Sequence, residues 1–181
     1  MSFDPQRLHF GIFGPGLSGK TTLAKYLSRH YWNPWRIKSL VHDINGDNWG
    51  PQAWCTTEEE KFWDMVWHRE VDCALFVEEA AETIARDNAM TALFTRVRHR
   101  QSPAGPGHRL HVIGHSGANL LPVQRQQIHT LYLFRQSQAG AELWAEEFAD
   151  DRILAATTLQ QYEFLYCRVY GVPRRCRLKL Y

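Results

Sequence analysis

The sequence lacks the features that mark disulfide-bonded, zinc-binding and membrane-spanning proteins. Its four cysteines are far apart along the chain and form no C-x-x-C pair, so we expect neither disulfides nor a zinc site. No apolar run approaches the roughly 20 residues that cross a bilayer, and the first residues lack the apolar centre of a signal peptide. We therefore expect no membrane span and a cytoplasmic location.

An excess of charge of one sign is also absent. The chain has 21 basic and 19 acidic residues, a net charge of +2, so contacts with nucleic acid would need local basic patches. Its 181 residues are 44% hydrophobic and 22% charged, which suits one domain with a well-buried core. Composition thus favours a single globular domain and leaves its partners open.

The most specific pattern in the chain is a glycine-rich loop near its start. Residues 14–22 read GPGLSGKTT and contain the spacing G-x-x-x-x-G-K-T. An apolar run of strand length, residues 8–13, precedes the loop, and apolar residues at helical spacing follow it. This order is the context of a phosphate-binding P-loop, in which backbone N–H groups and the positive end of the helix surround phosphate oxygens. A glycine-rich turn without a ligand is the alternative.

The P-loop pattern predicts a role for each of its residues. Lys20 would reach the β- and γ-phosphates of a nucleotide, and the Thr21 hydroxyl would be a ligand of Mg²⁺. Nucleotide contacts are expected along the whole loop, from Gly14, Pro15, Gly16, Leu17, Ser18, Gly19, Lys20, Thr21 and Thr22. The sequence therefore predicts nucleotide binding, and the reaction depends on residues elsewhere in the chain.

Strand-like apolar runs alternate with helical patterns along the rest of the chain. Such alternation predicts βαβ units and a mostly parallel central sheet flanked by helices, an α/β P-loop NTPase fold. Strands are expected at residues 8–13, 36–42, 71–77, 110–114, 130–134 and 163–170. Helices are expected after the P-loop, from residue 57 through residue 67, from the end of the third strand to about residue 100, and over roughly 140–149.

Two adjacent glutamates, Glu78 and Glu79, end the most apolar strand of the chain. In a P-loop protein, a carboxylate at this place holds the water shell of Mg²⁺, which is the Walker B role. A second acid beside it would face the γ-phosphate and activate an attacking water. The pair therefore favours hydrolysis, although acids also favour the first turn of a helix, where Glu79 would fit as well.

Three arginines occupy alternate positions just before a loop rich in proline and glycine. A guanidinium group can neutralise the charge that develops on a transferring phosphoryl group, and in ring ATPases the neighbouring subunit supplies one. We expect Arg98 to be such an arginine finger, which would act on the site of the neighbouring subunit. Alternatively, the segment is a basic helix end that complements the helix dipole. A third possibility is a DNA-backbone patch, a group of basic side chains that contact DNA phosphates. That patch would consist of Arg96, Arg100, His108 and Arg109.

Several segments follow one another in an order that is shared with a known family of ATPases. They are the P-loop, Leu40-Val-His-Asp43 followed by Trp49, Val77-Glu-Glu-Ala80, Arg96-Val-Arg-His99, His111-Val-Ile-Gly-His-Ser116, Leu120-Leu-Pro-Val-Gln-Arg125 and Thr130-Leu-Tyr-Leu-Phe-Arg135. In this order the chain resembles the FtsK-HerA superfamily, over about residues 8–170. Within that superfamily it is most similar to the small single-domain ATPases that package viral genomes.

The resemblance implies an activity, cofactors and partners. It implies a RecA-like P-loop fold, ATP and Mg²⁺ as cofactors, and a homo-oligomeric ring that hydrolyses ATP to move DNA, double-stranded in the case of genome packaging. Capsid vertex proteins would be further partners, and the location would be the host cytoplasm or the virion. It also implies one P-loop ATPase domain over residues 1–181, with its core at about 8–170 and a basic C-terminal tail at 172–181.

The resemblance also assigns roles to single residues. By position, Glu78 becomes the acid on the Mg²⁺ side, Glu79 the acid that activates water, and Arg98 the finger that acts on the neighbouring subunit. Two positions depart from the family pattern. The acid on the Mg²⁺ side is more often Asp, and the sensor after the fourth strand, usually Gln, is here His115, whose imidazole can hydrogen-bond a γ-phosphate oxygen. Arg125 is either a second phosphate-facing arginine or a residue of a helix surface.

A small P-loop kinase is the rival interpretation. Such kinases often place a substrate-binding or catalytic acid at the end of the second strand, where Asp43 lies. They also close an arginine-rich lid over the phosphates, for which residues 96–109 would serve. The two acids after the third strand favour hydrolysis instead. A nucleotide switch without turnover is a third interpretation.

The sequence gives little information about DNA contacts. Two loops are candidates for the pore of a ring, residues 45–54 with Trp49 and Trp54, and residues 101–109. Tryptophans also complete cores and subunit interfaces, so this assignment stays open. The basic end of the chain, residues 174–179, would touch phosphates or lie in solvent.

Overall fold

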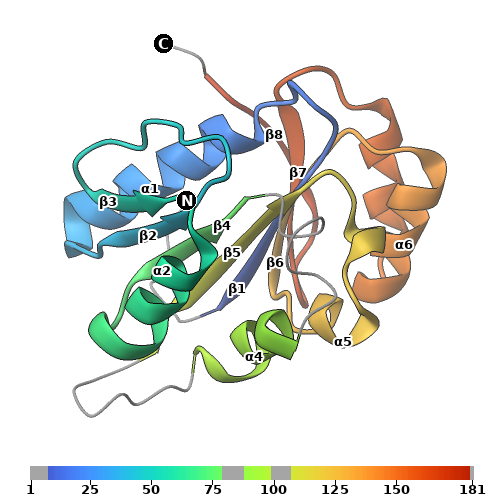
Figure 1. Ribbon diagram of the computed structural model, residues 1–181. Helices are drawn as coiled ribbons and strands as arrows, with labels where there is room; N and C mark the ends of the chain where they lie inside the picture. Colours follow the sequence, from blue (N-terminus) through green and yellow to red (C-terminus); the bar gives the residue numbers. More distant parts are fainter. Residues whose placement is uncertain (1–7, 79–87, 99–106, 180–181) are drawn as a thin grey trace.

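An eight-stranded sheet runs through the middle of the molecule, with helices on both of its faces (Figure 1). The computed structural model describes residues 8–78, 88–98 and 107–179. The strands are β1 (His9–Phe13), β2 (Ser39–His42), β3 (Ala53–Thr56), β4 (Ala74–Val77), β5 (Arg109–Gly114), β6 (Thr130–Phe134), β7 (Glu163–Arg168) and β8 (Arg174–Arg177). Across the sheet they follow the order β3-β2-β4-β5-β1-β6-β7-β8.

The first six strands are parallel, and the last two are antiparallel additions at one side of the sheet. β1 pairs in parallel with β5 and with β6, and β4 joins β5 to β2 in the same sense. β7 and β8 run antiparallel to their neighbours. The predicted mostly parallel α/β sheet is thus confirmed. Because parallel strands all end at one edge, the residues that follow them meet there.

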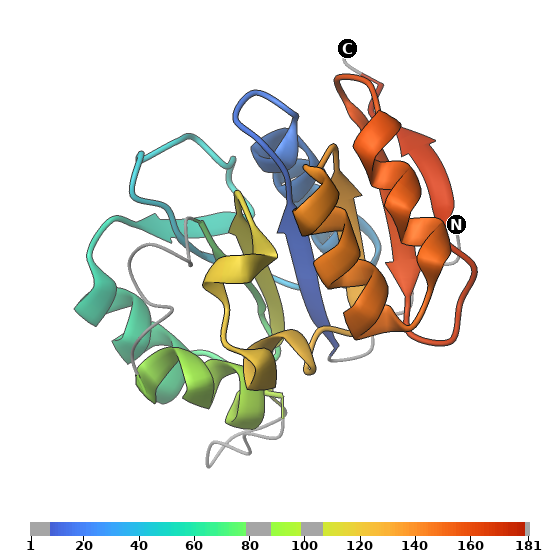
Figure 2. The same cartoon turned by 90° about the vertical axis from the view of Figure 1, so that its right-hand side faces the viewer.

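Helices cover both faces of this sheet, and Figure 2 shows the same layers from the side. They are α1 (Lys20–Trp35), α2 (Glu59–Asp64), α4 (Asn88–Arg96), α5 (Pro122–Arg125) and α6 (Gln138–Phe148), with short π- or 3₁₀-helices at Met65–Arg69, Gly117–Asn119 and Asp151–Thr158. α1 packs in a hydrophobic cluster on one face, and α2, α4 and α6 contribute to a separate cluster on the other. No helix within the described ranges is long and apolar enough to cross a membrane.

α1 leads away from the P-loop and has a well-defined start and end. Gly19 precedes it with a φ of +106°, a left-handed conformation that glycine adopts at no steric cost. The buried residues of α1 recur every three or four positions, so the helix packs along one apolar stripe. Arg36 ends the helix, also left-handed, and its N–H donates to the carbonyl of Trp32 at 3.0 Å.

A histidine in the core ties α1 to the sheet. His111 on β5 is fully buried, and its ring stacks between Phe10 and Phe76, with centroids 4.5 and 4.3 Å away. Its Nδ1 donates to the carbonyl of Leu75 at 3.0 Å, so its Nε2 accepts from the Tyr31 hydroxyl of α1, also at 3.0 Å. Burial lowers the pKa of His111 to about 3, so the ring stays neutral.

Two central strands are shorter than the sequence predicts. β2 begins at Ser39 rather than at residue 36, because Arg36 is taken up by the end of α1. β4 begins at Ala74 rather than at residue 71, and Asp72 just before it has a φ of +52°, which is outside the range of a strand. β6 has the predicted bounds, and β7 ends two residues early.

Neither edge strand is predicted from the sequence. β3 overlaps the end of the loop predicted at residues 45–54, and β8 lies inside the predicted basic tail. An edge strand pairs on one side only and carries no buried apolar alternation, so its residues give no strand pattern. Four residues of the tail thus continue the sheet, and Arg175 of β8 pairs with Glu163 of β7.

The predicted helices differ from the observed ones mainly at their starts. α2 begins at Glu59 rather than at residue 57, because the backbone of Glu58 is extended, with a φ of −95°. The Thr56 hydroxyl accepts the Glu58 N–H at 3.0 Å in the turn before the helix. The chain then continues as a π-helix over Met65–Arg69. Of the helix predicted up to about residue 100, α4 is the described part, and residues 79–87 and 99–106 lie outside it.

Candidate functional site

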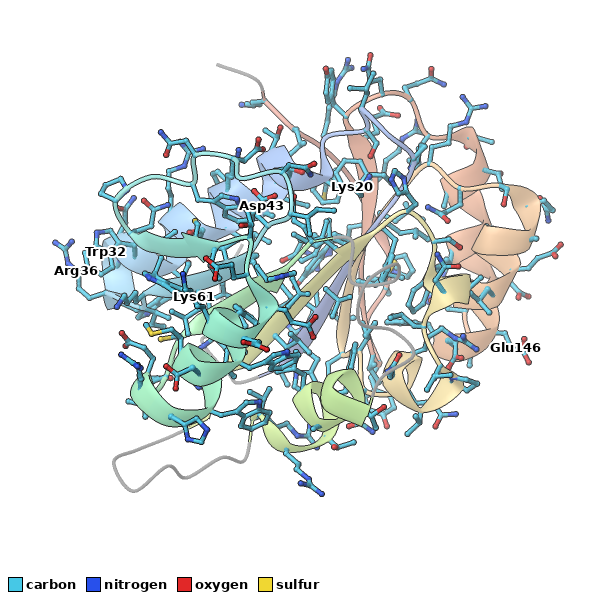
Figure 3. All side chains as sticks on the ribbon, in the orientation of Figure 1. Lys20, Trp32, Arg36, Asp43, Lys61 and Glu146 are labelled. Atoms are coloured by element: carbon cyan, nitrogen blue, oxygen red, sulfur yellow. The ribbon has the colours of Figure 1, made fainter. Side chains whose placement is uncertain are left out.

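The P-loop lies at the edge where the parallel strands end, between β1 and α1. The Gly14 N–H donates to the carbonyl of Gly114 at the end of β5, at 3.2 Å, which joins the loop to the neighbouring strand. Figure 3 labels Lys20, the first residue of α1, at this edge. Its ammonium group donates to the carbonyls of Gly14 at 2.9 Å and Pro15 at 3.0 Å. The lysine therefore bridges the loop from its end back to its start.

Packing holds the base of the loop and leaves its tip open. A Cβ at Gly14 would lie 2.5 Å from Cβ of Phe134, and a Cβ at Gly19 would lie 2.7 Å from Cδ1 of Leu178. No heavy atom of the described residues lies within 4 Å of the Cβ position at Gly16. The backbone at the tip is therefore free of packed side chains, as a phosphate cradle requires.

Two acids from neighbouring strands meet beside the Thr21 hydroxyl. Glu78 follows β4 and Asp43 follows β2, and these strands pair with Val77 opposite His42. The Thr21 hydroxyl and the carboxyl group of Asp43 both lie within hydrogen-bonding reach of the Glu78 carboxyl group. Both acids are buried, with exposed fractions of 4% and 1%. The P-loop and the two acids therefore form one site.

The surroundings of Glu78 make its carboxyl group hold a proton more tightly than usual. Burial raises the pKa of Glu78 to about 7, against the effect of the Thr21 hydrogen bond and with the help of the charges of Asp43 and Asp47. Its Oε1 is buried and has no hydrogen-bond partner among the described residues. A buried carboxyl oxygen without a hydrogen-bond partner can accept a cation or a hydrogen bond from a ligand. Glu79, the next residue, lies outside the described residues.

Asp43 is held in its ionised form by its own loop. Burial acts to raise its pKa, but hydrogen bonds from Trp49 Nε1 (2.9 Å), the Asn45 N–H (2.9 Å) and the Asp47 N–H (3.0 Å) hold the pKa of Asp43 below its usual value. From the sequence, Asp43 had a predicted role in the kinase interpretation alone. The signal that would have placed it beside Glu78 is the pairing of β2 with β4.

The resemblance pointed to two further residues near the phosphates. His115 follows Gly114 at the end of β5, next to β1, and its side chain is exposed at the P-loop edge. Arg125 lies on α5, where its guanidinium group pairs with Glu147 at 2.7 Å and donates to the carbonyl of Leu120 at 2.6 Å. Arg125 thus joins α5 to α6, which favours the helix-surface alternative over a phosphate-facing arginine.

Arg98 lies where the parallel strands begin, at the opposite edge of the sheet from the P-loop, which lies where they end. It follows α4, and its Nη1 lies 3.3 Å from Nε2 of His129, just before β6 begins. The end of α4 is also tied to the start of β5, because the His108 N–H donates to the carbonyl of Val97. Figure 1 shows α4 at the bottom, and Figure 3, in the same orientation, labels Lys20 near the top. The six residues of β5, at about 3.3 Å each, separate the two edges. The P-loop of its own chain is therefore beyond the reach of Arg98.

Two residues of the predicted DNA-backbone patch are buried and contact other residues of the fold. Arg109 is 4% exposed and pairs with Asp72 at 2.8 Å. His108 is 1% exposed, and its Nδ1 accepts the Cys73 N–H at 3.1 Å. Neither is accessible to DNA, so this part of the prediction is wrong. Arg100 lies outside the described residues.

The tryptophans predicted for a pore loop belong to the core. Trp49 is 3% exposed and packs on Phe76, with ring centroids 5.2 Å apart. Trp54 is half-buried on β3 and packs against the cluster beneath α2. The loop ahead of β3 thus closes one end of the sheet, and the burial of Trp49 favours the core alternative for that residue.

The proton on Glu78 should make the stability of the ligand-free protein depend on pH. A carboxyl group whose pKa is about 7 in the folded state and about 4.5 in the unfolded state binds its proton more tightly when folded. Stability is therefore lost as the pH rises from about 4.5 through 7, by roughly 3 kcal/mol in total. Glu78→Gln cannot ionise, so we expect it to match the wild type near pH 4 and to be the more stable protein at pH 8.

Urea unfolding at several pH values in the presence of a chelator measures this difference. Glu146→Gln, on the exposed side of α6 (Figure 3), is the matched control and should follow the wild type. A difference between Glu78→Gln and the wild type that stays constant with pH would contradict a raised pKa at this position.

The comparisons with known proteins concern the fold. No protein-family model and no curated protein sequence matches this chain, whereas solved structures do. The genome packaging NTPase B204 from Sulfolobus turreted icosahedral virus 2, in complex with AMPPCP, is similar with a TM-score of 0.76 and 16% sequence identity. The match covers 98% of this chain and 100% of B204.

Two other structures are similar to a lesser degree. The pCW3 conjugation coupling protein TcpA has a TM-score of 0.63 at 11% identity, over 96% of this chain and 60% of TcpA. The N-terminal domain of zonular occludens toxin from Neisseria meningitidis has a TM-score of 0.55 at 14% identity, over 97% of this chain and 95% of that domain. At such identities the likeness concerns the fold, and it confirms the P-loop NTPase fold that the resemblance to the FtsK-HerA superfamily predicts.

Proposed function

We propose that this chain is an ATPase of the FtsK-HerA superfamily that moves DNA, and that it packages viral genomic DNA into a capsid. The observation that carries the proposal is the meeting of the P-loop, the Thr21 hydroxyl and the buried acid Glu78 at one edge of the sheet. The fold around this site is shared with B204 over nearly the whole chain, and structures of B204 contain AMPPCP and ATP-gammaS. These facts support ATP as the ligand.

ATP would lie with its phosphates over the P-loop. The open tip at Gly16 leaves backbone groups accessible, and the start of α1 adds the positive end of a 16-residue helix. Lys20, whose ammonium group bonds to loop carbonyls, would exchange these contacts for oxygens of the β- and γ-phosphates. The loop thus needs little rearrangement to accept a triphosphate.

The residues around Thr21 fit a Mg²⁺ ion. Mg²⁺ prefers oxygen ligands and usually takes one or two from the protein, with phosphate oxygens and waters as the rest. Thr21 and Glu78 supply such oxygens at one point, and Oε1 of Glu78 has no hydrogen-bond partner among the described residues. When bound, the ion would neutralise charge on the β- and γ-phosphates.

Hydrolysis would depend on the acids that follow β4. Glu78 lies beside Thr21 and takes the Mg²⁺ side. We assign to Glu79, next in the sequence, the orientation and deprotonation of the attacking water. His115, at the end of β5 beside the P-loop, would contact the γ-phosphate as the sensor.

Arg98 would act on the site of a neighbouring subunit. Its place at the far edge of the sheet removes it from the P-loop of its own chain, as shown by its contact with His129. Each chain then presents a P-loop at one edge and an arginine finger at the other. Such a head-to-tail contact closes into a ring when repeated by rotation, so we propose a homo-oligomeric ring.

DNA and capsid proteins would be the partners of this ring. Double-stranded DNA would pass along its basic side chains, and exposed arginines such as Arg174 and Arg177 on β8 are candidates for phosphate contacts. Capsid vertex proteins would hold the ring in place during packaging, in the host cytoplasm or on the virion.

A small-molecule kinase is the second candidate, favoured by a hollow beside Asp43. The hollow, of about 480 Å³, lies between the loop after β2 and the start of α2, and Thr56 and Lys61 are among its lining residues. It is large enough for a small hydroxyl acceptor. However, the hydrogen bonds that Asp43 accepts and its lowered pKa make it a weak general base. We therefore favour the ATPase.

The stimulation of ATP turnover separates the two candidates. We expect the ATPase rate of the wild-type protein to rise when duplex DNA is added, because a motor couples hydrolysis to its track. Phosphate release measured with and without DNA, at several protein concentrations, tests this. Stimulation by a small hydroxyl acceptor and none by DNA would favour the kinase.

Two variants should separate nucleotide binding from hydrolysis. Lys20→Ala removes the cation that contacts the β- and γ-phosphates, so we expect hydrolysis to be abolished. Glu79→Gln alters water activation alone, so ATP affinity should stay unchanged while turnover is lost. ATP titration and phosphate release measure the two properties. A Glu79→Gln variant that turns over ATP at the normal rate would exclude Glu79 as the catalytic acid.

The trans position of Arg98 predicts recovery of activity in mixed rings. Arg98→Ala should bind ATP normally but lose turnover by about 10³-fold, as other arginine fingers do. Arg98→Ala subunits keep Glu79, and Glu79→Gln subunits keep Arg98, so a mixture rebuilds some complete sites. We expect partial recovery on mixing, and a wild-type rate per subunit that rises with protein concentration.

Arg96→Ala is the matched control for this experiment, because it removes the same charge from an exposed side chain two residues earlier. Its DNA-independent ATPase rate should equal that of the wild type. No recovery at any mixing ratio, together with a rate that is independent of concentration, would place the arginine in cis and favour the kinase.

A further inference from the structure

The strand order fixes the direction in which a bound nucleotide lies. The acids of the site, Glu78 and Asp43, follow β4 and β2, which lie on the β5 side of β1. A nucleoside triphosphate is elongated, so a nucleotide whose γ-phosphate points toward these acids extends its base to the other side of β1. That side of the P-loop is formed by β6, β7 and β8.

A hollow of about 380 Å³ opens on that side of the loop. It is lined by residues 17–22 and by Gln161 and Tyr162, the two residues ahead of β7. Because β7 is antiparallel to β6, its start lies at the edge where β1 and β6 end. The hollow therefore includes the P-loop and extends from it to the turn before β7, on the side away from the acids, where a base would lie.

Tyr162 is held in this hollow by a costly backbone conformation. Its φ is +64°, in the left-handed region where glycine and asparagine are the usual residues. Its carbonyl accepts the Leu178 N–H at 2.9 Å, and its ring lies against the P-loop, since Cδ1 is 3.1 Å from the Cβ position at Gly19. A half-buried aromatic ring at a strained turn beside the phosphate loop points to a functional role.

Gln161 joins the same turn to the tip of the P-loop. Its Nε2 donates to the carbonyl of Leu17 at 3.3 Å. Leu17 is itself left-handed, with a φ of +59°, and its side chain is 88% exposed. This hydrogen bond thus joins the left-handed Leu17 to the residue just before the left-handed Tyr162, across the rim of the hollow.

We propose that Tyr162 is the base-binding surface of the nucleotide site, with the base stacked on its ring and Gln161 at the rim. The proposal deepens the function proposed above and rests on it. Stacking does not depend on base identity, because every base presents a π face. We therefore expect ATP and GTP to bind with similar affinity, with the phosphates contributing most of the selectivity for a triphosphate.

Tripolyphosphate separates the base from the phosphates in a test of this proposal. Tyr162→Ala should lower the affinity for ATP by about tenfold through loss of stacking and leave the affinity for tripolyphosphate unchanged. Tyr162→Phe keeps the π face and should retain wild-type affinity for ATP. Tyr170→Ala, a fully exposed tyrosine beyond β7, is the matched control and should bind both ligands as the wild type does. Calorimetric titration in the presence of Mg²⁺ measures all four proteins.

Each outcome has a distinct meaning. Unchanged tripolyphosphate affinity in Tyr162→Ala shows that the variant is folded, so a selective loss for ATP supports the proposal. Equal losses for ATP and tripolyphosphate would mean that Tyr162 only supports the loop, and an unchanged affinity for ATP would mean that the base lies elsewhere. Either result overturns the proposal. If the wild type binds neither ligand, the nucleotide function itself fails.

Discussion

The register between β2 and β4 is the constraint on which the candidate site depends. With His42 opposite Val77, the two strands end at the same level, and the Glu78 N–H donates to the His42 carbonyl at 3.0 Å. Asp43 and Glu78 then leave the sheet side by side, although 34 positions separate them in the sequence. A slip of one residue would turn Glu78 to the other face of the sheet. The Thr21 hydroxyl, held at the start of α1, would then lose its partner.

This arrangement stores an electrostatic cost in the folded chain. Two acids lie together in a place with almost no solvent, where the pKa of Glu78 is raised and hydrogen bonds from its own loop hold the pKa of Asp43 below its usual value. A fold selected for stability alone would gain from a neutral side chain here. Strongly perturbed acids of this kind gather at functional sites, where a ligand supplies the missing positive charge. In the function that we propose, this cost prepares the site for a cation beside a triphosphate.

The sequence predicts the parts of the molecule that are encoded locally. The P-loop, the buried central strands and α6 depend on spacing and apolar runs within short windows, and β6 has the bounds predicted for it. The edge strands β3 and β8 could not be predicted, because their pairing on one side demands no apolar pattern. Asp43 and Tyr162 were missed as partners of the P-loop for a different reason. Their positions follow from strand order, which is a property of the whole sheet.

The positions of the site residues within the sheet also bear on the ring that we propose. Along the edge where the parallel strands end, β2 and β4 supply the acids, β1 supplies the phosphate loop, and the turn before β7 borders the hollow. The opposite edge carries Arg98 beside His129. A chain whose complementary groups lie on opposite edges of one rigid sheet cannot bring them together by moving side chains. In the ring that we propose, a second copy placed edge to edge would present its Arg98 to the first copy's P-loop. Association would then complete each site, so the assembly would control the chemistry.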